Sequence, residues 1–577
     1  MTLSRYVFVL FLLIVGSAHA QYITPFEATD SQATSTYGQC IKFYENLAKN
    51  FKNVSVKTFG STDAGYPLHI IETQTLGTQT TKKNSKVLQA IPTILINNAI
   101  HPGEPDGVDA SMMLVRDIAF GKINTPTPVK IVIIPIYNIG GSLNRSGVSR
   151  VNQNGPISYG FRGNAQNLDL NRDFIKADSR EAITFTQIFH TYKPHVFIDN
   201  HVSDGADYQH VMTLLTTQHN KLGGPVGEFL HQTFEPAIYA SMKQKNFPLV
   251  PYVNFEDGSP ETGWQAFFDG PRYSSGFAAL HGALAFVPET HMLKPFKDRV
   301  LATFELLKTI LQQTSHHAKT IVQNKALQQL QMATATQYPI SWKVDSTRVD
   351  SVVFMGYKAE TKVSKATLLP ILSYNHTKPF TKTIPFYNYL VTKEVVNKPK
   401  QFIIPQGWHA VLQRLQANGV PVLRFANDTV VWVQCTRIKQ YKPATRPYEK
   451  HFKHSQITTE TYYDSVLFLK GDYYLPLGHS TDRFVMETLT PQADDSYFAW
   501  NFFDAILQQK EGFANYRWND VAEQLLASNP TLLQQLEAKR AADPAFAASN
   551  DAQLDFLYKK SPYYEKVHLR YPVFQVR

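Results

Sequence analysis

A histidine and a glutamate lie three positions apart in the segment His101-Pro102-Gly103-Glu104. A neutral imidazole and a carboxylate that meet at a tight turn can bind one zinc ion, with each ligand atom about 2.0 to 2.2 Å from the metal. The preceding run Ile94-Leu95-Ile96 predicts a buried strand, and the proline and glycine mark the loop after it. Because open α/β sheets bind ligands at the carboxyl ends of their strands, we expect His101 and Glu104 to be metal ligands.

The same spacing occurs at His69 and Glu72, in the sequence YPLHIIETQ, where we exclude a metal site. The β-branched residues of this segment predict a strand, and side chains three positions apart on a strand point to opposite faces of the sheet. Two side chains on opposite faces cannot bind the same ion.

A catalytic zinc usually has three protein ligands and an open position for water, so a third ligand is needed. We favour His201, which follows the predicted strand Val196 to Ile198 and stands at the end of the strand that the HPGE loop can reach. A lone histidine in an α/β protein is more often structural, which makes four others weaker candidates: His195 at the opposite end of that strand, His210, His281 and His291.

The segment Phe161 to Phe174, with the sequence FRGNAQNLDLNRDF, adds an arginine, an aspartate and an Asn-Arg pair between the expected ligands. A further acid, Glu289, follows the predicted strand Ala283 to Val287. In this order the motifs resemble those of the zinc metallocarboxypeptidase family, of which carboxypeptidase A is the familiar member. The resemblance covers about residues 35 to 315, and the short spacing from Arg162 to Asn171 is similar to that of some branches of the family.

The resemblance implies one zinc ion as cofactor and a role for each matching residue. It makes His101, Glu104 and His201 the zinc ligands. The other roles it implies are Asp169 as the partner that orients the first histidine, Arg162 as the oxyanion donor, Asn171 and Arg172 as the carboxylate-binding pair, Tyr273 as a mobile tyrosine that closes over the substrate, and Glu289 as the general base.

Elementary chemistry supports these roles independently. The planar guanidinium of Arg172 can bind the free α-carboxylate of a peptide through two N–H groups. A donor such as Arg162 near the metal can stabilise the developing oxyanion by about 3 to 4 kcal/mol. Glu289 can take a proton from zinc-bound water and return it to the leaving amine. We therefore expect a zinc carboxypeptidase that acts on peptides with a free C-terminal carboxylate.

Two features bear on specificity and regulation. In the family, the specificity pocket lies between the mobile tyrosine and the catalytic glutamate, here residues 274–287, which are mostly small or apolar and include no acid. This composition disfavours C-terminal lysine or arginine. No activation segment is recognisable before the catalytic domain, so we expect no zymogen.

Two other functions fit part of the pattern. A zinc hydrolase acting on cell-wall peptides with D- or γ-linked residues, or on small amidated acids, would also use Asn171 and Arg172, because they suit any carboxylate near the cut. A non-catalytic binding protein on the same scaffold is the other alternative. The presence of all three ligands together with Glu289 favours an enzyme.

The order of the predicted elements indicates an α/β fold. Strand Thr93 to Asn98, helix Val108 to Phe120 and strand Val129 to Ile136 illustrate the alternation of strands with helices. Such alternation predicts a three-layer α/β/α domain on a mixed, mostly parallel sheet. The loop Asn138 to Asp173 is long for a compact domain, so we expect it to be functional.

A chain of 577 residues is too long for one core, so several domains are expected. We place a catalytic domain at residues 21–336, a small β-rich domain at 337–450 and a mixed helical segment at 451–577. Residues 437–453 are rich in lysine and arginine, which favours a solvated linker over a docking patch for anions. The C-terminal region is expected to be a lid, a cell-envelope module or a stabilising appendage.

Residues 1–20 predict a secretory signal peptide, with Arg5, an apolar core from Val7 to Val15 and the small-residue cleavage site Ala18-His19-Ala20. The apolar core is too short to span a bilayer, and no later stretch is long enough. We expect export, to the periplasm or out of the cell, and no transmembrane segment.

The charge distribution argues against a nucleic acid partner, and the cysteine content argues against a disulfide framework. The net charge is +10, but the basic residues are dispersed, so we expect no nucleic acid partner. The two cysteines, Cys40 and Cys435, fall in different predicted domains and make no disulfide framework. We predict that both are buried thiols.

Overall fold

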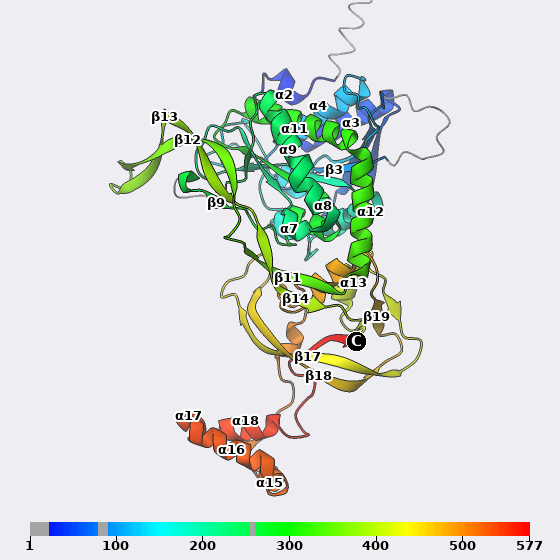
Figure 1. The fold of residues 1–577 in the computed structure, drawn as a ribbon, viewed down its shortest axis with the longest axis vertical. Coiled ribbons are helices and arrows are strands. Elements are labelled where there is room, and N and C mark those ends of the chain that lie inside the picture. The colour runs from blue at the N-terminus through cyan, green and yellow to red at the C-terminus, as the bar shows by residue number, and fades with distance from the viewer. Residues whose placement is uncertain (1–21, 79–90, 254–259) are drawn as a thin grey trace, which may run out of the picture.

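The computed structural model describes residues 22–78, 91–253 and 260–577. The expected signal peptide, residues 1–20, lies outside the described residues. Figure 1 shows three parts along the long axis: a large α/β part, a smaller part rich in strands, and a small bundle of helices at the far end.

A nine-stranded sheet forms the centre of the α/β part, in the order β1-β2-β4-β3-β5-β10-β7-β8, with β6 paired to β10. The central pairs β4–β3, β3–β5, β5–β10 and β6–β10 are parallel, as is β7–β8, whereas β1–β2, β2–β4 and β7–β10 are antiparallel. The prediction of a mixed, mostly parallel sheet is therefore confirmed. Its strands are β1 (Val54–Ser61), β2 (Pro67–Gln74), β3 (Thr93–Asn97), β4 (Lys130–Ile134), β5 (Val196–Asp199), β6 (His201–Ser203), β7 (Met212–Thr216), β8 (Val250–Pro251) and β10 (Leu284–His291).

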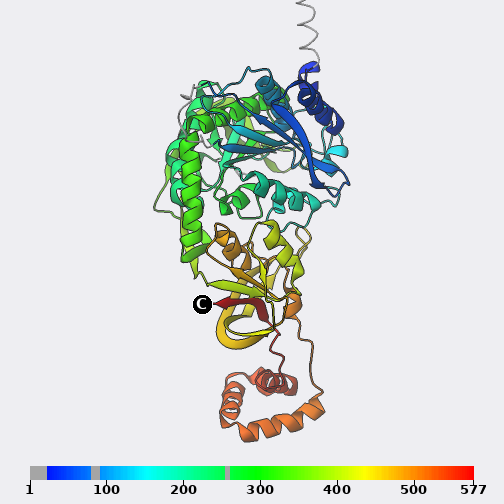
Figure 2. The same cartoon turned by 90° about the vertical axis from the view of Figure 1, so that its right-hand side faces the viewer.

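Helices cover both faces of this sheet, as Figure 2 shows. The helix α4 (Asp106–Ala119) packs against α11 (Phe296–His316), and α6 (Arg180–Tyr192) packs against β1 and β3. All five residues of β3 are buried, as its continuous apolar run predicts for a strand covered on both faces. The other helices of this part are α2 (Pro25–Ala28), α3 (Tyr37–Asn50), α5 (Ile139–Leu143), α7 (His219–Leu222), α8 (Gly224–Phe229), α9 (Glu235–Gln244), α10 (Ser274–Leu280) and α12 (Ala318–Thr334).

The loop between β3 and α4 is fixed against its neighbours. Asp106, at the start of α4, is buried, and its Oδ2 accepts hydrogen bonds from Arg299 Nε at 2.9 Å and from Thr290 Oγ1 at 2.5 Å. A Cβ atom on Gly107 would lie 2.4 Å from Cβ of Asn200, so only glycine allows this close approach. The HPGE loop is therefore held at the carboxyl end of β5.

Three more sheets follow in the C-terminal region. β11 (Gln337–Val344) pairs with β14 (Leu390–Asn397), and β12 (Asp350–Val363) pairs with β13 (Pro370–Tyr387). β13 also pairs with β9 (Trp264–Gln265) of the α/β part, which joins the two parts by backbone hydrogen bonds. A six-stranded sheet contains β15 (Gln401–Ile404), β16 (Leu423–Arg424), β17 (Thr429–Pro443), β18 (His454–Phe468), β19 (Tyr473–Pro476) and β20 (Arg570–Val576).

The helices of this region are α13 (His409–Ala417) and α14 (Asp482–Leu489), followed by the distal bundle. That bundle has its own small core, in which Trp518, Leu536 and Phe546 are buried. Its helices are α15 (Asn515–Ser528), α16 (Pro530–Ala542), α17 (Pro544–Ala547) and α18 (Asn550–Lys559).

Residues 437–453 are not a linker, so that prediction is wrong. β17 continues to Pro443 because it pairs with β18 along its length, and residues 444–453 form the turn between the two strands. Position 450, where we expected a domain boundary, lies in this turn. One sheet therefore contains strands from both of the expected C-terminal ranges.

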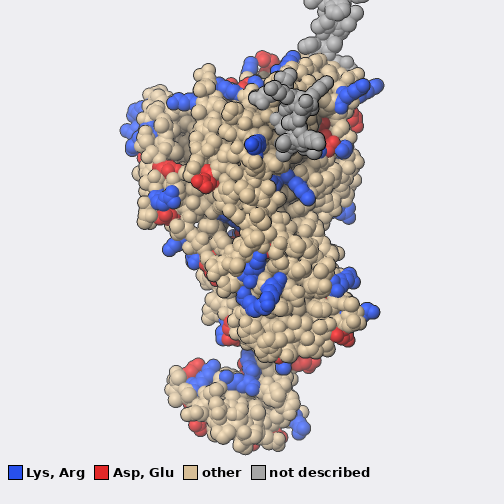
Figure 3. All heavy atoms as spheres, turned by 45° about the vertical axis from the view of Figure 1, so that its right-hand side comes forward, with Lys and Arg blue, Asp and Glu red and all other residues tan. Residues whose placement is uncertain are grey.

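Cys40 and Cys435 are buried and unbonded, as predicted. Figure 3 shows lysine and arginine side chains scattered over the visible face among acidic and neutral residues. Within the described residues, no helix is both long enough and apolar enough to cross a bilayer.

Candidate metal centre

His101, Glu104 and His201 come together at the carboxyl ends of their strands. One ligand atom from each of the three buried residues lies within 4.8 Å of the others, and the two imidazole centroids are 5.0 Å apart. Nδ1 of His101 is 3.3 Å from Oε1 of Glu104, and Nδ1 of His201 is 3.1 Å from Oε2. The three predicted ligands therefore converge on one point.

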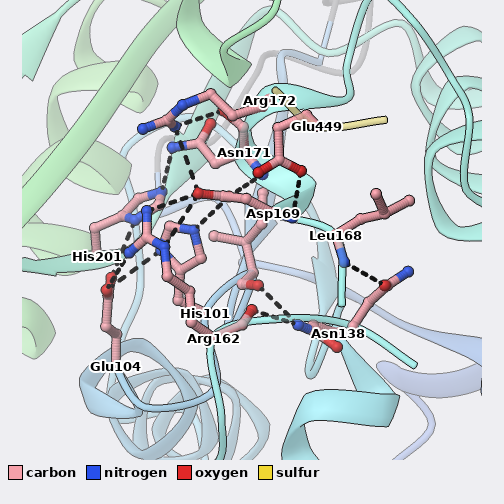
Figure 4. A network of polar contacts seen from close by, with 12 residues as sticks. His101, Glu104, Asn138, Arg162, Leu168, Asp169, Asn171, Arg172, His201 and Glu449 are labelled. Carbon is pink, nitrogen blue, oxygen red and sulfur yellow. Dashed lines mark hydrogen bonds and ion pairs between the residues drawn. The ribbon is translucent and has the colours of Figure 1, made fainter. Parts of the chain in front are cut away.

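Each imidazole is oriented by a carboxylate on its other side. Nε2 of His101 is 2.8 Å from Oδ1 of Asp169, and Nε2 of His201 is 3.1 Å from Oδ2 of Asp199 (Figure 4 shows the first of these pairs). A proton on Nε2 that is donated to a carboxylate leaves the lone pair of Nδ1 free. Both lone pairs then point to the position between the ligands.

The surroundings of these ligands suit a divalent cation. Nδ1 of His101 is buried and has no hydrogen-bond partner among the residues that the structure describes, and a bound metal would supply one. Burial opposes charge on His201, but the carboxylates of Asp199 and Glu104 outweigh it and hold the pKa of His201 well above its usual value. This excess of negative charge in a buried site favours a cation, and imidazole and carboxylate ligands are those that zinc accepts.

Glu104 is also bound by groups other than the histidines. Its Oε1 accepts a hydrogen bond from Arg150 Nη1 at 2.8 Å, and its Oε2 accepts one from the backbone N–H of Val202 at 2.9 Å. Burial acts to raise the pKa of Glu104, but the charges of His101 and Arg150 outweigh burial and hold that pKa well below its usual value. The carboxylate is thus kept ionised and fixed in orientation.

Glu289 lies beside these ligands because β6 and β10 are parallel neighbours in which His201 is paired with Glu289. The surrounding walls shield its carboxyl group from water and raise its pKa to about 8. The carboxylate of Glu104 adds to this rise, whereas His201 and Arg162 oppose it. A glutamate with a raised pKa can hold and release a proton near neutral pH.

Arg162 shares the carboxylate of Asp169 with His101. Its Nε and Nη2 atoms donate to Oδ2 of Asp169 at 3.1 and 2.8 Å, and its Nη1 lies 3.6 Å from Oε1 of Glu104. The side chain keeps 46% of its surface exposed, so it faces the cleft while remaining anchored. Burial opposes ionisation of Asp169, but His101 and Arg162 hold its pKa far below the usual value.

Asn171 and Arg172 belong to a short 3-10 turn, Leu170–Arg172. Nδ2 of Asn171 lies 3.4 Å from Nε2 of His201, and its Oδ1 accepts a weak hydrogen bond from Ser274 N at 3.4 Å. The guanidinium of Arg172 lies over the ring of Tyr273, 4.5 Å from its centroid. The turn thus brings the expected carboxylate-binding pair next to the candidate ligands.

One cleft of about 500 Å³ unites these residues. Eight of the nine predicted site residues line it, and the ninth, Asp169, lies behind His101. The eight are His101, Glu104, Arg162, Asn171, Arg172, His201, Tyr273 and Glu289.

The four weaker histidine candidates have partners elsewhere. Nδ1 of His195 accepts from Thr93 N at 3.1 Å, Nδ1 of His210 lies 2.8 Å from the carbonyl of Pro248, and Nε2 of His291 lies 3.1 Å from the carbonyl of Ala206. His281 packs edge-on against His190, with centroids 4.7 Å apart.

Sequence reasoning missed three contributors to the site. Asp199 had a usable signal, because residues two apart on a strand share a face, which places it beside His201. Arg150 had no such signal in the sequence, because it lies in the loop Asn138 to Asp173, which shows little periodicity. Asp204, which follows β6, lines the cleft and adds an acid outside residues 274–287, where the specificity pocket is expected.

No family model matches the sequence, and no curated protein matches it. Three solved structures that the fold resembles are metallo-carboxypeptidases. A metallo-carboxypeptidase from Burkholderia cenocepacia has 16% sequence identity and a TM-score of 0.36, and the match covers 49% of this chain and 70% of that one. One from Pseudomonas aeruginosa, in complex with (2-guanidinoethylmercapto)succinic acid, has 14% identity and a TM-score of 0.35, covering 48% of this chain and 69% of that one. Carboxypeptidase A from Helicoverpa armigera has 14% identity and a TM-score of 0.35, covering 56% of this chain and 86% of that one. Likeness at these values carries no inference about activity, which has to come from the geometry of the site.

Proposed function

We propose that this protein is a zinc-dependent metallocarboxypeptidase that hydrolyses the C-terminal peptide bond of its substrates. The observation that carries the proposal is the convergence of His101, Glu104 and His201 in a cleft that also presents Glu289 and Arg172. When bound there, one zinc ion would supply a Lewis acid that polarises a carbonyl and lowers the pKa of water.

Glu289 is the general base and then the general acid of this proposal. Its carboxylate takes a proton from the attacking water and returns it to the amine that leaves. Burial raises the pKa of this carboxyl group, which favours the protonated form that acts as the acid, and the charge of a bound cation would favour the carboxylate that acts as the base.

Arg162 donates hydrogen bonds to the oxygen that becomes negatively charged as the water attacks. Its contacts with Asp169 fix the guanidinium beside the cleft before the substrate arrives, so little reorganisation is needed. A preorganised donor of this kind contributes about 3 to 4 kcal/mol to the stability of the transition state.

Arg172 and Asn171 recognise the free carboxylate of the substrate. The guanidinium can bind it through two parallel N–H groups, and the amide adds a neutral donor. Tyr273 packs on Arg172 at 4.5 Å, from where its ring can contact the terminal residue. Recognition of a carboxylate next to the scissile bond distinguishes a carboxypeptidase from an endopeptidase.

We also propose that the protein is exported, on the basis of the signal-like residues 1–20. Peptides outside the cytoplasm would then be its substrates.

The proposal is tested by assaying release of amino acids from N-acylated dipeptides and from the same compounds with a C-terminal amide. We expect hydrolysis of the carboxylates and little of the amides, because an amide offers Arg172 no negative charge. Equal hydrolysis of both compounds would refute recognition through Arg172. Hydrolysis of muropeptides alone would change the substrate class from ordinary peptides to cell-wall peptides.

A further inference from the structure

The turn between β17 and β18 reaches from the C-terminal region into the wall of the candidate site. The hydroxyl of Tyr448 accepts a hydrogen bond from Nε of Arg172 at 2.9 Å. Oε2 of Glu449 accepts one from the backbone N–H of Asp169 at 2.9 Å. Figure 4 shows Glu449 next to Asp169 and Arg172. The turn therefore contacts both the expected carboxylate-binding arginine and the aspartate that orients His101.

This turn has a tight and well-defined conformation. Glu449 and Lys450 have φ angles of 48° and 76°, in the left-handed region that non-glycine residues seldom adopt. Tyr448 and His451 exchange two backbone hydrogen bonds, of 2.8 and 3.1 Å, which close the turn. Positive φ angles at both central residues are those of a tight two-residue hairpin turn, which the pairing of Tyr448 with His451 closes.

A buried tryptophan fixes the turn from behind. The ring of Trp500 is fully buried and stacks with Tyr448, with centroids 6.2 Å apart, and its Nε1 donates to Oδ1 of Asp495 at 3.1 Å. The same carboxylate binds Arg272, with Nη2 2.8 Å from Oδ1. Arg272 directly precedes Tyr273, so the cluster of the C-terminal region supports both groups that touch Arg172.

Arg172 is thus held on two sides, by the ring of Tyr273 and by the hydroxyl of Tyr448. Nη1 donates to the carbonyl of Asn171 at 2.8 Å, and Nη2 makes no hydrogen bond to any described residue. Because an arginine carries five N–H donors, those remaining on the two Nη atoms are available to a carboxylate in the cleft. Tyr448 is not among the residues that line the cleft, but its hydroxyl is hydrogen-bonded to Arg172, which does line it.

We infer that the turn Tyr448–His451 is a positioning element for substrate binding, in which Tyr448 sets the orientation of the Arg172 guanidinium. The inference rests on the proposed function, since it assigns to the C-terminal region part of the subsite for the substrate carboxylate. The catalytic domain then does not hold the complete binding site by itself.

The test compares Tyr448→Phe with Tyr463→Phe in the full chain. Tyr463 lies on β18 of the same hairpin, is 52% exposed and, among the described aromatic residues, stacks only on Trp432. Its change to phenylalanine therefore controls for the loss of a tyrosine hydroxyl. Tyr448→Phe keeps the stacking ring but loses the acceptor. We expect KM for an N-acylated dipeptide to rise about tenfold, which is the typical effect of one hydrogen bond to a charged group, with kcat changed by less than about twofold. Tyr463→Phe should match the parent protein.

A double variant distinguishes positioning of Arg172 from general stabilisation of the contact between the Tyr448–His451 turn and the α/β part. If Tyr448 acts through Arg172, adding Tyr448→Phe to Arg172→Gln should leave KM where the single Arg172→Gln variant places it. An unchanged KM in Tyr448→Phe, or an equal further rise in the Arg172→Gln background, would overturn the inference.

Calorimetric binding of 3-phenylpropanoate, which carries a carboxylate and an aromatic ring, gives a readout independent of turnover. The parent should bind it about tenfold more tightly than Tyr448→Phe, because the variant lacks the hydrogen bond between Arg172 and the Tyr448 hydroxyl. If this difference is found while the parent cleaves no peptide, the inference stands and the proposed function fails. If peptides are cleaved but neither KM nor binding depends on Tyr448, only the inference fails. A parent protein that does not bind 3-phenylpropanoate would also overturn it.

Discussion

Oδ1 of Asp169 lies 2.8 Å from Nε2 of His101, while Nδ1 of the same ring faces Glu104 at 3.3 Å. The aspartate therefore decides which ring nitrogen carries the proton and which is free to bind a metal. Without its negative charge, His101 would be a poorer and less oriented ligand.

Replacing Asp169 by asparagine should weaken zinc binding by about 10- to 100-fold, the usual effect of losing such a partner. Competition with a chromogenic chelator measures this directly. Asp520→Asn, at an exposed position of α15 in the distal bundle, is the matched control and should bind zinc like the parent. Equal zinc affinity in Asp169→Asn and the parent would show that Asp169 does not orient the ligand.

Glu289→Gln should retain zinc and lose turnover. The amide fits the same space but cannot take or return a proton, so we expect kcat to fall by about 10²- to 10⁴-fold. Metal analysis and single-turnover hydrolysis of the same sample distinguish loss of chemistry from loss of metal. A variant that hydrolyses peptides at the parental rate would eliminate Glu289 as the base.

Arg162→Gln should lower kcat by about 10²- to 10³-fold, because a preorganised donor to the oxyanion is lost. KM should change little, since the ground-state carbonyl carries less charge than the transition state. Steady-state kinetics with an N-acylated dipeptide tests this split. A rise in KM alone would indicate that Arg162 binds the substrate and not the oxyanion.

Asp109 on α4 should make folding stability depend on pH. It is fully buried, which raises its pKa from 3.8 to about 7, although hydrogen bonds from Thr34 and Ser35 oppose the rise. The folded chain then keeps a proton that the unfolded chain releases between these two pH values. The stability contributed by this group is therefore present below pH 3.8 and is lost as pH rises towards about 7.

Asp109→Asn removes this titration, so the variant should gain stability relative to the parent on going from pH 5 to pH 8. The gain should be on the order of a few kcal/mol. Thermal unfolding of both proteins at the two pH values measures it. A difference in melting temperature that is the same at pH 5 and pH 8 would argue against a raised pKa at Asp109.

Much of the candidate site could be predicted because parallel strands place their carboxyl ends at one edge of a sheet. His101 follows β3, His201 opens β6 directly after β5, and Glu289 is paired with His201 across β6 and β10. For these residues, position relative to a strand largely determines position in space. The α/β fold was predictable for the same reason, since its strands alternate with helices.

Contacts that depend on distant loops could not be predicted. Arg150 binds Glu104 across 46 positions, from a loop whose path no periodicity reveals. Tyr448 binds Arg172 across 276 positions, and its segment is so rich in lysine and arginine that it suggested a linker. Composition reports how polar a segment is, but not which surface its turn reaches.

The central claim is that three side chains hold a metal on which hydrolysis depends. Zinc content and dipeptide hydrolysis should be measured together on the purified full chain, before and after treatment with a chelator and after zinc is returned. We expect one zinc ion per chain, loss of activity with the metal, recovery when it is restored, and neither metal nor activity in His201→Ala. Full activity in metal-free protein, or in His201→Ala, would contradict the claim.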